Sequence, residues 1–241
     1  MQAPTAAELL GAWERSAALG PAEREDAFLR LTQPDEDPAG LPVGERDARL
    51  LELRELLFGG RLDGAAECPR CGEPVEYSAS ARTLRTERPQ AANGDGHGLN
   101  AFGYELRFRL PTGGDLAEAA AAHDLEGARE LLLERCVLSA TADGREEAPA
   151  GLPPRVVAAL AERLAEVDPL ADTRLALTCP GCGCDWTVAL EIGSWLWSEV
   201  ESWAWRTLFD VHVLASAYGW SEAAVLALGP RRDLYLELVK G

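Results

Sequence analysis

The sequence contains very little lysine and no long uncharged apolar stretch. Lys240 is the only lysine among 23 basic residues, which are outnumbered by 40 acidic residues and leave a formal net charge of −17. A chain this acidic repels nucleic acid and anionic membranes, because binding to phosphates depends on Lys and Arg. The most apolar segment, residues 195–215, includes four charged side chains. It therefore does not meet the roughly 18 uncharged residues typical of a membrane-spanning helix.

The motifs of common enzyme sites are also missing. The sequence has no phosphate-binding glycine loop, no nucleophile elbow and no dinucleotide-binding glycine pattern. Its three histidines, His97, His123 and His212, lack the spacing of a catalytic metal site. The first residues show no basic segment followed by an apolar one, so we expect no signal peptide and a cytoplasmic location. We expect a protein that is not an enzyme.

Most of the sequence shows the periodicity of helices. Apolar residues recur at helical spacing over 6–19, 21–32, 44–58, 116–123, 125–137, 155–167, 195–217 and 222–228. Asp115 is expected to cap the helix that follows it, and Ser194 and Ser221 are expected to cap the last two helices of this series. Gly59 and Gly219 are expected to end the helices that precede them.

Shorter segments alternate between apolar and polar residues, as half-buried strands do. They cover 73–81, 104–111, 173–178 and 185–192. Residues 86–100 have almost no apolar side chains, so we expect a mobile loop or internal linker there. The predicted fold class is therefore α+β, mainly α-helical with a small β module.

Two cysteine pairs share the pattern Cys-Pro-x-Cys-Gly. Cys68 and Cys71 form the first pair, Cys179 and Cys182 form the second, and 107 residues lie between them. In such a turn both thiols face the same way, and the glycine lets backbone N–H groups approach sulfur. Zn²⁺ prefers four such ligands in a tetrahedron. We therefore expect one structural Zn²⁺ site, shared by the two halves of a split zinc ribbon.

Two other interpretations of the pairs stay open. Each can be a separate redox pair, although a thioredoxin-type pair begins a helix whereas these begin strand-like segments. Both can also be relics that bind no metal. The separation itself does not prevent a shared site, because closing such a loop costs roughly 4 kcal/mol and structural zinc contributes roughly 10–16 kcal/mol in small modules. We expect Cys184 to be a neighbour of the site and Cys136 a core thiol.

A shared site divides the chain into parts. The β module then carries an insertion of helices and a strand between its two halves. The predicted parts are N-terminal helices over 1–60, a split zinc ribbon over 61–82 and 173–192, an inserted α+β segment over 83–172, and a Trp-rich helix with short helices over 193–241.

Four of the seven tryptophans lie within residues 195–205. A helix that is apolar around most of its circumference needs cover on more than one side. It is either a central core helix or a helix that offers one tryptophan stripe to a partner, since Trp is frequent in interface hot spots. We expect Trp197, Trp205 and Trp220 to be partner-binding residues.

Several longer segments, spread over most of residues 40–240, together resemble the sequences of a known family. They are GERDARLLELRELLFG before CPRCG, then YELRFRLPTGGDLAEA, then LTCPGCGCDW before the Trp-rich helix, and finally VHVLASAYGWSEAAVLALGPRRDLYLELV. This set resembles the baseplate proteins of contractile-tailed phages and related contractile injection systems. The resemblance implies a non-enzymatic protein that joins or helps assemble a baseplate, with other baseplate or tail subunits as partners. The four cysteines of the two pairs match the knuckles of that family.

The function that we expect is a structural or assembly component of such a particle, with zinc holding the fold. The alternative is a zinc-ribbon protein that binds nucleic acid or acts in transcription. The net charge and the acidic flanks of the first pair, Glu67 and Glu73, disfavour phosphate contacts there. A hydrolase with an unrecognised active site is a third interpretation, which no residue pattern supports.

Overall fold

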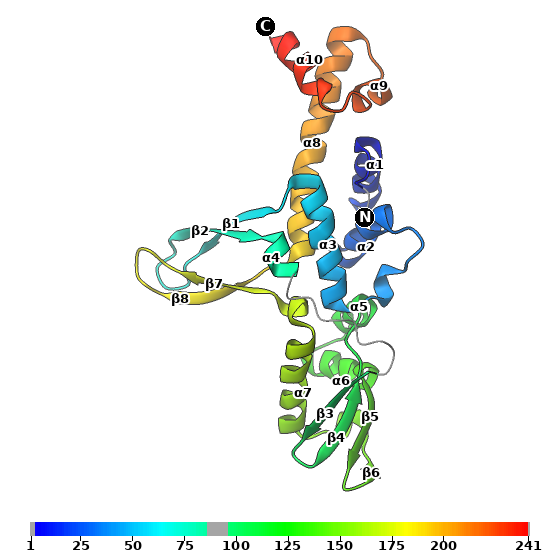
Figure 1. Cartoon of the computed structure of the whole chain (residues 1–241), viewed down its shortest axis with the longest axis vertical. Coiled ribbons are helices and arrows are strands. Elements are labelled where there is room, and N and C mark those ends of the chain that lie inside the picture. The colour runs from blue at the N-terminus through cyan, green and yellow to red at the C-terminus, as the bar shows by residue number, and fades with distance from the viewer. Residues whose placement is uncertain (1–2, 86–95, 241) are drawn as a thin grey trace. The chain divides into compact units, whose positions relative to one another are not determined.

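The computed structural model describes residues 3–85 and 96–240. The chain forms two compact units, which are described separately below (Figure 1). Unit 1 combines residues 1–36 with 192–241, and unit 2 consists of residues 37–191.

Unit 1 is helical in its described residues. Its helices are α1 (Ala6–Ser16), α2 (Pro21–Thr32), α8 (Ile192–Tyr218), α9 (Glu222–Leu226) and α10 (Arg231–Lys240). Pro21 begins α2 as expected, because a proline at the first helical position has no N–H that needs a partner. Gly219 ends α8 at a φ of 68°, and the Ser221 side chain accepts the N–H of Ala224, as predicted. The expected cap at Ser194 is wrong, because Ile192 is buried and already helical.

Aromatic rings join the helices of unit 1. The ring of Phe28 on α2 stacks on Trp197 of α8 with centroids 5.8 Å apart. The guanidinium carbon of Arg24 lies 4.1 Å from the centroid of the same tryptophan. Trp13 of α1 meets Trp205 edge-on at 5.7 Å. Trp197 and Trp205 of α8 thus contact the N-terminal helices, which come from the other end of the sequence.

Unit 2 contains all of the described strands. Its helices are α3 (Val43–Phe58), α4 (Ala81–Arg85), α5 (Gly113–Ala120), α6 (Leu125–Cys136) and α7 (Pro154–Val167), with 3₁₀ turns η1 (Pro38–Gly40), η2 (Pro149–Gly151) and η3 (Pro169–Asp172). Its strands are β1 (Arg61–Glu67), β2 (Pro74–Ser80), β3 (His97–Ala101), β4 (Tyr104–Phe108), β5 (Val137–Ala142), β6 (Arg145–Glu146), β7 (Arg174–Thr178) and β8 (Asp185–Ala189). The predicted α+β class, with helices as the larger part, is confirmed.

The strands form three antiparallel sheets. Two of them are separate two-stranded hairpins, β1–β2 and β7–β8, and these carry the cysteine turns. The third has the order β3-β4-β5-β6, and its buried face packs with α7 in a core that includes Leu106, Phe108, Val156 and Leu160. The alternation of residues 104–111 predicted the buried positions Leu106 and Phe108 of this core.

The predicted loop over 86–100 is wrong for its last residues. Residues 97–100 belong to β3, where Leu99 lies opposite Leu106 on β4 and His97 stacks on Phe108 at 5.5 Å. This pairing satisfies the backbone of a segment whose own side chains give no strand signal. Residues 86–95 lie outside the described ranges.

A buried carboxylate far away in the sequence caps α3. Asp168, which lies directly before η3, accepts the backbone N–H of Gly44 at 3.0 Å from a position 124 residues away. A Cβ atom at position 44 would lie only 1.7 Å from the Asp168 carboxylate, so the close approach requires glycine. The start of α3 is thus fixed by tertiary structure.

Asp115 connects the end of β4 to α5 and α6, and it is not the helix cap that the sequence predicted. Thr112 is the N-cap of α5, and Asp115 lies three residues later, where its carboxylate accepts the N–H of Thr112 at 2.8 Å. Arg109 donates two hydrogen bonds to this carboxylate, at 2.6 and 2.9 Å, and Arg135 of α6 donates a third at 3.2 Å. The Arg109 guanidinium holds the pKa of the buried Asp115 carboxyl well below its usual range.

We expect Asp115 to stabilise the fold except in acid. Its folded pKa is lower than the value of about 3.9 in an unfolded chain, so its contribution is present above about pH 4 and is lost as the pH falls through the folded pKa. Asp115→Asn should lower the free energy of unfolding at neutral pH by about 2 kcal/mol, because it weakens charge-assisted hydrogen bonds. Urea unfolding measures this, and between about pH 5 and 2 the variant should lose less stability than the wild type. Glu130→Gln, at an exposed position, is the control; an equal loss in both variants would contradict the assignment.

Candidate metal centre

The first cysteine turn joins β1 to β2 through a short backbone loop. The N–H of Gly72 donates to the carbonyl of Cys68 at 2.9 Å, and the N–H of Cys68 donates to the carbonyl of Glu73 at 2.9 Å. Gly72 has a φ of 76°, a left-handed conformation that glycine adopts without strain. The sequence predicted this role for the glycine after the second cysteine.

The second turn, between β7 and β8, repeats this pattern. The N–H of Gly183, at a φ of 66°, donates to the carbonyl of Cys179 at 2.9 Å. The N–H of Cys179 donates to the carbonyl of Cys184, also at 2.9 Å. Cys184 therefore occupies the position that Glu73 occupies in the first turn. Its carbonyl closes the turn. It is not one of the two cysteines, Cys179 and Cys182, whose positions match those of Cys68 and Cys71 in the first turn.

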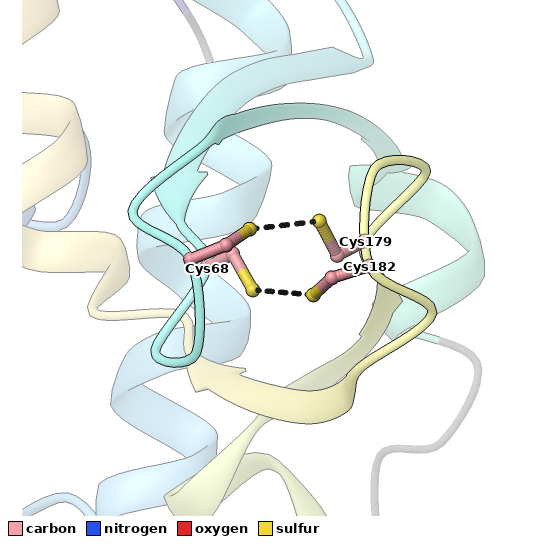
Figure 2. A group of neighbouring side chains, drawn as sticks. Cys68, Cys179 and Cys182 are labelled. Carbon is pink, nitrogen blue, oxygen red and sulfur yellow. Dashed lines mark hydrogen bonds between the residues drawn. The ribbon is translucent and has the colours of Figure 1, made fainter.

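The two turns face each other and bring four sulfur atoms together (Figure 2). The Sγ atoms of Cys68, Cys71, Cys179 and Cys182 all lie within 4.8 Å of one another. Cys68 lies 3.6 Å from Cys182, and Cys71 lies 3.6 Å from Cys179. A tetrahedron of thiolates around zinc, at about 2.3 Å per bond, has edges of about 3.8 Å. A disulfide needs about 2.05 Å, so the spacing fits four ligands of one metal ion and not two disulfides.

The electrostatics of the thiols also favour a bound cation. Burial raises the pKa of the Cys68 thiol, but the N–H groups of Cys71 and Arg70 outweigh burial and lower that pKa to about 6. At Cys182 the N–H of Cys184 lowers the pKa, but burial and the three neighbouring thiols raise it to about 12. The turns thus stabilise the thiolate form of Cys68, while the neighbouring thiols keep the thiol of Cys182 protonated. A divalent cation removes the repulsion between neighbouring thiolates, so the donor set can hold a metal ion.

The surroundings of the four thiols bury two of them and leave Cys71 exposed. Cys68 and Cys179 are buried, and Val75 and Trp186 pack against the cluster. The carboxylate of Glu73 lies over Gly181 in the opposite turn, where a Cβ would lie 1.9 Å from its oxygen. Four sulfur ligands complete a tetrahedron and leave no open position for a substrate or a reactive water.

The other thiols and the histidines stay outside this cluster. Cys184 is half-buried beside it, and Cys136 is buried at the end of α6. His97 stacks on Phe108, and His123 and His212 are exposed. Among residues 3–85 and 96–240, the four cysteines form the only group of three or more potential metal ligands.

The three tryptophans predicted to bind partners differ in their exposure. Trp205 is 62% exposed, whereas Trp197 is half-buried beneath Arg24. Trp220 is half-buried between Tyr218 and Tyr235, with centroids 4.7 and 4.9 Å away. Their role in binding stays a prediction. No helix among the described residues combines the length and apolarity needed to cross a membrane.

The sequence did not single out Phe209, which is 63% exposed and lies four residues after Trp205 on the same face of α8. The spacing of four residues from Trp205 could have shown that both rings lie on one face of the helix. The sequence showed an apolar stripe, but it did not show that this part of the stripe lies uncovered.

The chain was compared with known protein families, curated proteins and solved structures. A family model described as T4 bacteriophage base plate protein matches residues 25–193. No curated protein and no solved structure matches the chain. The matched range contains both cysteine turns and all of unit 2, and it ends at the start of α8.

The ligand set can be tested by elemental analysis of purified variants. We expect one metal ion per wild-type chain, and we expect Cys182→Ser to lose most of it, because a serine hydroxyl is a much poorer ligand than a thiolate for a soft metal site. Cys184→Ser is the matched control, since its carbonyl closes the turn and its thiol is not one of the four. Equal loss of metal from the two variants, or a metal-free wild type, would rule out this site.

Proposed function

The chain belongs to the T4 bacteriophage base plate protein family, and from this premise we propose that it is a structural or assembly component of the baseplate of a phage-tail-like contractile particle or injection system. The family match over residues 25–193, which is most of the chain, carries the proposal. Other baseplate and tail subunits are the partners, and the particle is assembled in the cytoplasm. The proposed role is not enzymatic and, given the net charge of −17, involves neither nucleic acid nor membrane insertion.

We propose that the four cysteines hold one structural Zn²⁺. The spacing of the sulfurs, the N–H groups directed at them and the absence of an open coordination position support zinc as a structural ion. When bound, zinc supplies a fixed tetrahedral junction. The protein supplies Cys68 and Cys71 from the first hairpin, and Cys179 and Cys182 from the second.

This junction suggests how the chain is organised. We propose that residues 61–82 and 173–192 act as one split zinc ribbon, which carries residues 83–172 as an insertion. The N-terminal helices over 1–60 and the helices over 193–241 flank it. In this arrangement a single ion joins segments separated by 107 residues. The ion gives a particle subunit a rigid connection that does not require a large hydrophobic core.

Trp197, Trp205 and Trp220 are the proposed contacts with neighbouring subunits. The high exposure of Trp205 supports this role most directly, because large exposed aromatic side chains commonly mark binding surfaces. Trp197 and Trp220 offer part of each ring at the surface while stacking on residues of unit 1.

Removing zinc should unfold the protein. Cys179→Ser, or treatment with a strong chelator, should abolish most folded, soluble protein, because structural zinc contributes roughly 10–16 kcal/mol in small modules, which matches or exceeds the roughly 5–15 kcal/mol stability of a typical domain. Circular dichroism during heating measures the loss, and Cys184→Ser serves as the control. A Cys179→Ser protein that stays soluble with unchanged melting would show that zinc does not hold the fold.

The role in a baseplate can be tested by isolating the particle. The tagged wild type should co-purify with baseplate subunits, identified by mass spectrometry. Trp205→Ala and Trp197→Ala should each reduce co-purification by at least about tenfold, a larger effect than their effect on the melting temperature, which falls more for Trp197→Ala because Trp197 stacks on Phe28. Leu125→Ala, at an exposed apolar position of unit 2, is the control. A wild type that retains no baseplate subunit contradicts the proposed function, and parallel losses of binding and stability would show that the tryptophans are only core residues.

A further inference from the structure

A groove of about 440 Å³ lies between α8 and α10, entirely within unit 1. Trp203 and Thr207 of α8 and Leu236 of α10 line it, and Thr207 and Leu236 are buried. Trp205 and Phe209 stand at the same site and expose 62% and 63% of their surface. We call this surface, together with the charged residues described below, the α8–α10 patch.

The patch combines protruding rings with a recess. Trp205 and Phe209 are four residues apart, so they lie on one face of α8, and Trp13 supports the Trp205 ring edge-on. Two aromatic rings exposed to this degree beside an apolar groove are unfavourable in water and typical of an interface. An interface related by a two-fold axis requires that one patch be complementary to itself. A patch that carries both rings and a groove meets this requirement in shape.

The charged residues of the patch are also arranged so that one patch is complementary to another copy of itself. Within the groove, Arg232 forms an ion pair with Asp210 at 3.4 Å. Arg206 on the α8 wall and Asp233 on the α10 wall are exposed, and neither side chain forms a hydrogen bond or ion pair with the residues that the structure describes. The patch thus has one unpaired charge of each sign, on opposite walls.

Charge balance distinguishes this surface from the protein as a whole. The chain carries a net charge of −17, so contact between two copies is opposed by repulsion over most surfaces. The patch contains two arginines and two aspartates and is locally neutral. It offers a second copy an apolar contact without like-charge repulsion, and a two-fold axis gives both unpaired charges a partner.

We propose that a second copy of this chain binds the α8–α10 patch. Trp205 and Phe209 of each copy enter the groove of the other copy, and Arg206 of each forms an ion pair with Asp233 of the other. The proposal rests on the proposed partner-binding role of Trp205, which it makes specific. Its test uses the purified full-length chain and needs no other subunit of the particle.

Sedimentation equilibrium of the purified full-length chain, over a wide range of concentrations, tests the dimer. The wild type should change from monomer to dimer as concentration rises. Trp205→Ala and Phe209→Ala should each weaken dimerisation by at least about 100-fold, because each removes a large aromatic contact twice per dimer. Leu125→Ala, which truncates a side chain that is 89% exposed in unit 2, should have no effect. Melting temperatures at concentrations where the wild type is monomeric should change little, since the truncated rings are largely exposed.

Exchanging the charges tests the geometry of the interface. Arg206→Asp and Asp233→Arg should each weaken dimerisation, because each places like charges opposite one another twice. An equimolar mixture of the two variants should dimerise again, since both contacts in the mixed dimer join opposite charges. The double variant should also dimerise, whereas Arg145→Asp, at an exposed position of β6, should behave like the wild type.

A wild type that stays monomeric, or a mixture that fails to recover, overturns the proposal. Equal effects of Trp205→Ala and Leu125→Ala on dimerisation would overturn it as well. None of these results affects co-purification with baseplate subunits, so a failure of the dimer is distinguishable from a failure of the proposed function. If Trp205→Ala reduced only that co-purification, the patch would bind a different subunit and the dimer would be rejected.

Discussion

Four sulfur atoms held within 4.8 Å of one another are the constraint on which the two cysteine hairpins of unit 2 depend. The two hairpins that carry them are separate two-stranded sheets, and such hairpins are marginally stable at best on their own. The apolar side chains beside the sulfurs are few, with Val75 and Trp186 the main ones. A metal ion bound at the junction, as we propose, would supply the stability that this small core lacks, and the closely matched backbone geometry of the two cysteine turns suits such a site.

The insertion between the cysteine turns is stabilised by different means. Its sheet has a core of its own against α7, and Asp115 ties the end of β4 to α5 and α6 through two arginines. Asp168, at the far end of the insertion, caps α3 before the first turn. The contact between Asp168 and Gly44 thus brings the end of the insertion next to α3, which shortens the loop that the proposed metal site has to close.

Unit 1 has both a buried core and exposed aromatic side chains. Its long helix α8 buries one stripe, including Leu196, Val200 and Leu214, and leaves Trp205 and Phe209 exposed. The family match ends at the beginning of this helix. The part of the chain that the family model describes is therefore the part that holds the cysteine site, whereas the exposed aromatic residues lie beyond it.

Features that depend only on neighbouring residues could be predicted from the amino-acid sequence. Pro21, Gly219 and Ser221 mark helix ends correctly, because capping and backbone conformation are local properties, and the spacing within each cysteine pair fixes the shape of its turn. Strands β1 and β3 were missed because small or polar residues such as those at 64–66 and 97–98 become strand only when a partner strand satisfies their backbone. Three other features follow from the tertiary fold: the two turns meet, Asp168 caps α3 and Trp205 lies uncovered. Each of these depends on residues far apart in the chain, and periodicity shows which side chains are apolar but not which of them another segment covers.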